Sequence, residues 1–187
     1  MESLDTSFKD LVRALGESNR LNAASHKPVF YFVYPATEIL YVRRRLPQWC
    51  SLIEVGGRDA EVICFGDLLW SAIDESNRWQ LWRSAEASYS RSAFNQSVSA
   101  LLEKALPLKI EERLASVGPG STVILSGAEL LHPWIRTRAL EHCISTATKG
   151  PVVVLYPGHR SGQYGLEYLG FYEVDGNYRS SMYGVEA

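Results

Sequence analysis

The chain has 187 residues, of which 46% are apolar and 21% charged, and its formal net charge is -2 at pH 7. This length suits one hydrophobic core, and the composition excludes a wholly disordered protein. A weakly acidic chain also lacks the surplus of Lys and Arg that a generic polyanion binder needs to displace counterions. We therefore expect a single α/β domain over residues 1–187.

The first quarter of the chain predicts a helix, a strand and a second helix. Apolar residues recur at helical spacing over Leu4–Leu15, which predicts an amphipathic opening helix within residues 1–20. The apolar, β-prone run Val29–Tyr34 predicts a buried strand. A helix over Thr37–Gln48 is expected next, with Thr37 as its cap and Pro47 near its end.

The middle of the chain predicts one strand followed by several helices. Ala60–Gly66 has the composition of a strand, and Asp67 directly after it is placed to cap a helix. Pro107 interrupts a later helical pattern, so two short helices are expected there. The second of them is predicted over Leu108–Val117 and is followed by the helix-stopping sequence Gly118-Pro119-Gly120.

The last third of the chain contains a strand, a helix and a second strand. Ser121–Ser126 and Pro151–Tyr156 are the strands, and the helix between them is predicted over residues 133–147. A unit of this kind makes its two strands parallel with a right-handed crossover. We therefore predict a mostly parallel, Rossmann-like three-layer sheet with helices on both faces. The turn sequence Asp175-Gly176-Asn177 predicts a C-terminal edge hairpin over residues 169–185.

Ligands of such sheets bind at the loops that follow the carboxyl ends of the strands. The loops that qualify, and that are expected to share one crevice, are Pro35–Glu38, Gly66-Asp67, Ser126–Glu129 and Pro157–Gly162. The chain contains no GK[ST] phosphate loop, no HExxH zinc motif and no GxSxG nucleophile elbow. We therefore predict no cofactor, no metal site and no enzymatic activity.

A hydrolase is the weakest alternative. Ser126 directly follows a strand and would need His132 or His159 as its base, with Glu129 or Asp67 to orient that base. A turn residue whose hydroxyl satisfies backbone groups is the favoured interpretation of Ser126.

The candidate binding residues lie near the last two strand ends. Arg136 follows the expected helix start at Pro133, where it could bind an anion or a partner's carboxylate. Five tryptophans and ten tyrosines exceed what one small core holds, which favours a protein interface. The residues predicted to bind a partner or an anion are Glu129, His132, Trp134, Arg136, His159 and Arg160. In the alternative of a degenerate nucleotide- or DNA-binding domain, Arg136, His159 and Arg160 contact phosphates.

The cysteines and the N-terminal sequence indicate the cellular compartment in which the protein is expected. Cys50, Cys64 and Cys143 are odd in number and far apart, as expected for buried thiols in a reducing compartment. The N-terminal residues lack the order of a secretory signal, and no apolar run approaches the ~18 residues of a membrane span. We expect a cytoplasmic protein without a membrane partner.

Several stretches together resemble one protein family. They are VILSGAELLHPWIRTR at residues 123–138, VVVLYPG at 152–158, LGFY at 169–172 and NYR at 177–179. In sequence and in order they are similar to the BrxB family of the BREX phage-defence systems, although the chain has His132 where the family pattern has tyrosine.

The resemblance implies an accessory component of a bacterial defence system that distinguishes its own DNA from phage DNA by methylation. It implies action through protein partners, including the large phosphatase-like component PglZ, with DNA association only indirect or weak. It brings no catalytic residues with it.

Overall fold

The computed structural model describes most of the chain. The described residues are 3–18, 29–85, 88, 90–162, 164–176, 178 and 180–184. The ends of the predicted opening segment 1–20 and parts of the predicted hairpin 169–185 therefore lie outside them. Within the described ranges, no helix is both long enough and apolar enough to cross a membrane.

A mostly parallel sheet forms the centre of the molecule. Its main strands run in the order β2-β3-β4-β1-β7, and each neighbouring pair is parallel. These strands are β1 (Val29–Tyr34), β2 (Asp59–Cys64), β3 (Ser121–Ser126), β4 (Val152–Ser161) and β7 (Ser181–Gly184). The predicted fold class is confirmed, because the apolar runs that predicted strands occupy the central positions of a parallel sheet.

Helices cover both faces of the sheet, as predicted. Alternate side chains of a strand point to opposite faces, so β1 contributes to two separate cores. Phe30 and Phe32 pack with helices α1 (Leu4–Ser18) and α2 (Ile39–Val55), whereas Tyr31 packs on the opposite face. That second core is closed by α3 (Phe65–Glu75), α5 (Arg91–Ala115) and α6 (Thr137–Ala147).

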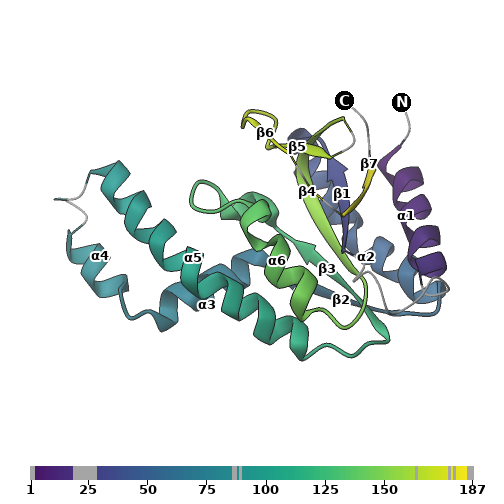
Figure 1. The fold of residues 1–187 in the computed structure, drawn as a ribbon, viewed down its shortest axis with the longest axis horizontal. Coiled ribbons are helices and arrows are strands. Elements are labelled where there is room, and N and C mark those ends of the chain that lie inside the picture. Colours follow the sequence, from purple (N-terminus) through teal and green to yellow (C-terminus); the bar gives the residue numbers. More distant parts are fainter. Residues whose placement is uncertain are drawn as a thin grey trace.

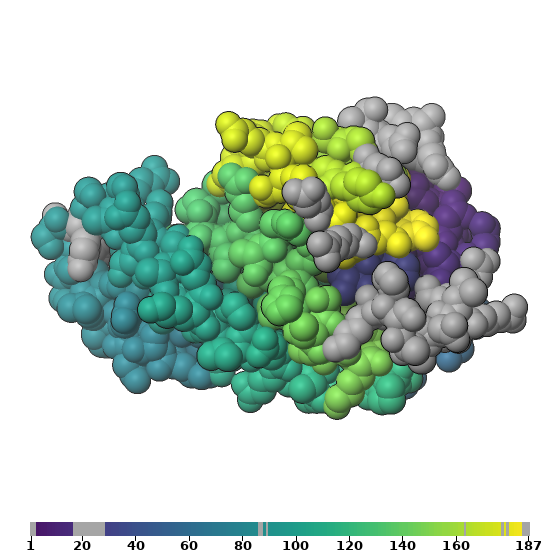
Figure 2. Space-filling model, in the orientation of Figure 1, coloured from purple at the N-terminus to yellow at the C-terminus, as the bar shows by residue number. Residues whose placement is uncertain are grey.

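A helical arm extends from one edge of the sheet. It consists of α3, α4 (Trp79–Ala85) and the first half of α5, and it lies on the side of the sheet opposite α1 (Figure 1). Trp82 is buried inside the arm, where its ring meets Phe94 edge-on with centroids 5.8 Å apart. In the space-filling view the arm projects from the body of the molecule (Figure 2).

Two prolines lie inside helices that the sequence predicted to end or break near them. Pro47 lies within α2, and Pro107 lies within α5, which runs unbroken from Arg91 to Ala115. Proline removes one helical hydrogen bond and usually interrupts the helix. In α5 a stripe of buried residues at helical spacing spans the proline: Val98, Leu102, Leu106, Ile110 and Leu114. Packing of this stripe against the core outweighs the local penalty.

Three predicted helix starts are displaced. Thr37 lies in the short 3-10 helix η1 (Ala36–Glu38), and α2 begins after it. Asp67 lies in the first turn of α3, whose N-cap is Cys64. The helix predicted from Pro133 begins at Thr137, because the chain first forms the 3-10 helix η2 (Ala128–Leu131) and a turn.

The predicted C-terminal hairpin over residues 169–185 is wrong in its position. The antiparallel hairpin forms earlier, where the extension of β4 turns back into β5 (Gly165–Tyr168), and the two-residue β6 (Val174–Asp175) then pairs with β5. Strand β7 pairs in parallel with β1 instead. The turn signal around Asp175 is local, whereas the open edge of β1 is available only after the sheet has formed.

Candidate functional site

The strand ends that were predicted to carry a site lie along one edge of the sheet. Cys64 at the end of β2 is in register with Ser126 at the end of β3, and Tyr34 at the end of β1 is in register with Pro157 of β4. The loops that follow these residues therefore start from the same edge. Helix η2, which follows β3, contacts both α3 and β4 there.

Glu129 forms an ion pair at this edge. Its Oε1 atom accepts hydrogen bonds from Arg43 Nη2 at 2.6 Å and from Arg43 Nε at 3.2 Å, and its side chain is only 12% exposed. Burial, and then the Glu129 carboxylate, raise the pKa of Tyr34 well above its usual value. Tyr168 donates a hydrogen bond to the carbonyl of Ala128 at 2.6 Å. These contacts fix the loop after β3 against α2 and β5.

A second group of contacts, which we call the loop cluster, consists of His132, Arg136, Phe171, Tyr172 and Asp175. The Tyr172 hydroxyl lies 2.6 Å from His132 Nδ1, and the His132 and Phe171 rings meet edge-on at 5.6 Å. Arg136 donates to Asp175 Oδ2 at 3.2 Å, and its guanidinium carbon lies 4.3 Å from the centre of the Tyr172 ring. Arg136 is therefore held by both a carboxylate and an aromatic face.

The backbone after β5 explains how the loop cluster is presented. Leu169 has a φ of 56° and Gly170 a φ of 74°, so the chain turns through the left-handed region at both positions. For leucine this conformation costs on the order of 1–3 kcal/mol, which is offset by a hydrogen bond from Leu169 N to Pro157 O at 2.9 Å. As a result, Phe171 stands 64% exposed at the surface.

The structure brings together three of the six predicted binding residues. His132 and Arg136 belong to the loop cluster, and His159 lies beside it, since a Cβ atom at Gly170 would be 3.3 Å from His159 Nε2. Arg160 follows His159 on β4, and its side chain therefore points to the opposite face.

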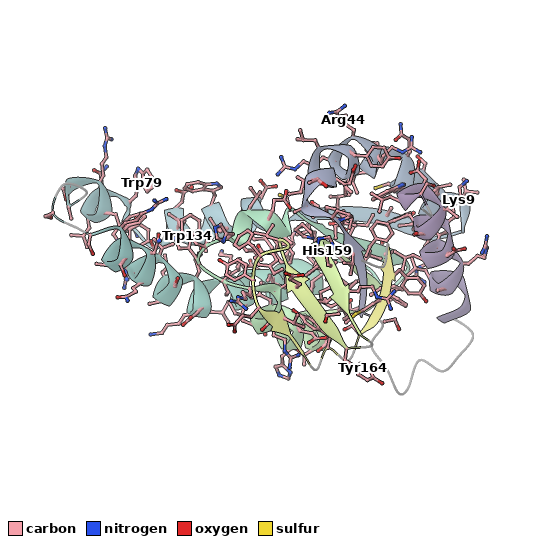
Figure 3. The ribbon with its side chains drawn as sticks, turned by 90° about the horizontal axis from the view of Figure 1, so that it is seen from above. Lys9, Arg44, Trp79, Trp134, His159 and Tyr164 are labelled. Carbon is pink, nitrogen blue, oxygen red and sulfur yellow. The ribbon has the colours of Figure 1, made fainter. Side chains whose placement is uncertain are left out.

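The other two predicted residues have different surroundings. Glu129 pairs with Arg43 on α2. Trp134 points toward the arm, where its indole N–H donates to Asn95 of α5 at 3.2 Å. Figure 3 shows Trp134 and His159 well separated. The six residues thus form no single pocket, although most of them lie along the same edge.

The residues proposed for the hydrolase alternative are not joined to Ser126. Ser126, His132, His159, Glu129 and Asp67 are all described, and no hydrogen bond among described residues links Ser126 to any of the other four. His132 is bonded to Tyr172 and Glu129 to Arg43 instead. In the part of the chain that the structure covers, no group of three or more His, Cys, Asp or Glu side chains could hold a metal ion.

Comparison with known proteins identifies the family. A family model described as BREX protein BrxB matches residues 63–182. The chain belongs to the BrxB family. The resemblance seen in the sequence is thereby confirmed, and the protein takes part in BREX phage defence. No curated protein and no solved structure matches the chain. The BrxB match runs from β2 into β7 and includes the whole loop cluster, whereas α1, β1 and α2 precede it.

Sequence reasoning missed several members of the site. Phe171 and Tyr172 were assigned to a strand, although the neighbouring Leu169-Gly170 sequence is compatible with a turn. Asp175 lies in the predicted turn 175–177, and its pairing with Arg136 has no local signal. No spacing rule pairs Arg43 with Glu129, because 86 residues separate them.

Proposed function

We propose that this BrxB-family protein is a noncatalytic accessory subunit of a BREX defence complex, which acts by holding a larger component through protein contacts. The partner that we expect is the PglZ-like, phosphatase-like protein of the same system. The observation that carries the proposal is the exposure of Phe171 on a loop at the strand-end edge that is hydrogen-bonded to β4.

An exposed aromatic side chain on a fixed backbone is well suited to binding a protein. Aromatic residues dominate the energetics of protein interfaces, and little conformational entropy is lost when the side chain is already positioned. The neighbouring charges support the same function, because Arg136 is paired with Asp175 and Arg43 with Glu129. Charges neutralised in pairs can be covered by a partner at lower cost than isolated ones.

The proposal predicts that the tagged protein co-purifies with the PglZ-like protein when the whole BREX system is expressed. Phe171→Ala should weaken this association by about tenfold or more, the range found for aromatic residues at the centre of an interface. Tyr164→Ala is the matched control, because Tyr164 is 55% exposed and lies outside the loop cluster. If no other BREX component co-purifies with the wild-type protein, the proposal is wrong.

The noncatalytic part of the proposal has its own test. Ser126→Ala should leave phage protection unchanged, measured as the efficiency of plating on cells that carry the complete system. Loss of protection by this variant, with the thermal unfolding curve intact, would support a hydrolase in place of an assembly subunit.

A further inference from the structure

Two tryptophans form an exposed corner where α3 meets α4. Trp70 is 52% exposed and Trp79 is 48% exposed, and their rings meet edge-on with centroids 6.2 Å apart. Trp79 lies on the arm, far from the hairpin residue Tyr164, as the labels in Figure 3 show. Large aromatic side chains that remain half exposed after folding are common anchors of protein interfaces.

The corner continues toward the strand-end edge. The Leu130 side chain lies directly over Gly66, since a Cβ atom there would be 2.7 Å from Leu130 Cδ1. Gly66 and Trp70 are four residues apart on α3 and so share one face of the helix. Leu130 is itself 40% exposed. Leu130, Trp70 and Trp79 therefore form an apolar stripe, which we call the arm stripe, from the loop after β3 to the corner between α3 and α4.

Charges of opposite sign flank the two tryptophans. Asp67 and Asp74 lie three residues before and four residues after Trp70, so these exposed carboxylates flank it on the same helix face. Arg78 precedes Trp79, and Arg83 lies one turn after it, and both are exposed. Among the described residues, no ion pair neutralises any of these four charges.

The sequence of the arm tip has the opposite charge to the rest of the protein. Residues 76–102 contain three arginines and one glutamate, whereas the rest of the chain contains sixteen basic and twenty acidic residues. The acidic flank of the arm stripe therefore lies toward a net acidic body, and its basic flank lies at a net basic tip.

We propose that the arm stripe binds an amphipathic helix of a partner protein, one with an apolar stripe, basic residues toward one end and acidic residues toward the other. The proposal rests on the proposed function, because it assigns this helix to the PglZ-like component. The helix would place its basic end against Asp67 and Asp74 and its acidic end against Arg78 and Arg83. Helices that bind apolar surfaces in this way anchor through residues at helical spacing.

The mixed charge favours a protein over a nucleic acid. Single-stranded DNA also stacks on aromatic side chains and contacts arginines. Its phosphates carry one sign of charge, however, and Asp67 and Asp74 beside Trp70 would repel them. A protein surface can present both signs of charge at once, which fits this pattern.

The test uses the full-length protein and the purified PglZ-like protein of the same system in a binding titration. Trp79→Ala should weaken binding by about tenfold or more. The charge reversals Asp67→Lys/Asp74→Lys and Arg78→Glu/Arg83→Glu should each weaken it, because each opposes the charge at one end of the bound helix. Tyr164→Ala should bind like the wild type. Thermal unfolding of every variant establishes that the fold is retained.

A parallel titration with single-stranded DNA separates the alternatives. DNA binding would be weakened by Arg78→Glu/Arg83→Glu but strengthened by Asp67→Lys/Asp74→Lys, and this pattern overturns the inference. Self-association that Trp79→Ala abolishes also overturns it. If the wild type binds the PglZ-like protein and the arm variants bind equally well, the inference is wrong while the proposed function stands. If the wild type does not bind that protein, both are wrong.

Discussion

Replacing Asp5 by alanine is expected to lower the free energy of unfolding by about 1–3 kcal/mol. Asp5 on α1 accepts hydrogen bonds from Trp49 Nε1 at 2.9 Å, from Arg45 Nε and Nη2 at 2.9 and 2.7 Å, and from the Tyr41 hydroxyl at 2.9 Å. Trp49 is fully buried and stacks on Phe8 with ring centroids 4.3 Å apart, so its indole cannot turn toward another acceptor.

The magnitude follows from how exposed each donor is. Leaving the buried Trp49 N–H without a partner costs about 1–3 kcal/mol. Arg45 and Tyr41 are more than a third exposed and can hydrogen-bond to water, so the loss of their hydrogen bonds adds little. For a chain of this size the loss corresponds to a fall in Tm of about 2–12 °C.

The effect should also depend on pH. Burial by itself would raise the pKa of Asp5, but the hydrogen bonds from Arg45, Trp49 and Tyr41 hold it below its usual value. A carboxyl whose pKa is lowered by folding stabilises the folded state fully above the unfolded pKa of about 4. This contribution is lost as the pH falls through the lowered pKa. The difference in unfolding free energy between the wild type and Asp5→Asn should therefore shrink in acid.

Chemical denaturation at several pH values measures both predictions. Asp10→Ala is the matched control, because Asp10 lies on the same helix and pairs only with the exposed Arg13 among described residues. An equal loss of stability in the two alanine variants, or a difference for Asp5→Asn that persists at low pH, would refute the reasoning.

Three further predictions concern the core and the sheet edge. Gly184 has a φ of 109°, and a Cβ atom at this position would lie 1.9 Å from Val33 O. Gly184→Ala should therefore lower the free energy of unfolding, measured by chemical denaturation, by about 2 kcal/mol or more. Gly176→Ala should cause no such loss. Burial raises the pKa of Tyr178 to about 12, so its stabilising effect is full below about pH 10 and lost as the pH rises further. The difference in tyrosinate absorbance between the wild type and Tyr178→Phe should therefore appear only with unfolding, and a difference in the folded protein near pH 10 would contradict this. Burial, and then the charge of Glu111, raise the pKa of Cys143 to about 11. This thiol should therefore react with a thiol reagent at pH 8 only after the protein unfolds. Mass spectrometry of the labelled peptide can establish this.

Sequence patterns predicted the central elements well because those patterns are local. The run Val29–Tyr34 is buried along its whole length, as its continuous apolar composition indicated. The strand at Ser121–Ser126 has the predicted bounds, and the βαβ unit that it begins makes a parallel sheet. Side-chain spacing along a single segment contains the information needed for these predictions.

Local rules failed where packing outweighed them. Pro107 satisfies every local condition for a helix break, yet the buried leucines on either side of it keep α5 continuous. The Asp175-Gly176 turn signal led to the wrong pairing, since β7 joins β1 in parallel. A local turn preference is worth little against the backbone hydrogen bonds and buried area that an open strand edge offers.

By itself, the sequence determined the fold class, the strand-end location of the candidate site and the family resemblance from residue 123 onward. Only the tertiary structure decided which side chains meet there. Arg136 and Asp175 are 39 residues apart, as are Trp134 and Asn95, and no periodicity relates such pairs. The structure also left Phe171, Trp70 and Trp79 exposed. Exposure depends on how all the elements pack together, so a linear sequence cannot specify it locally.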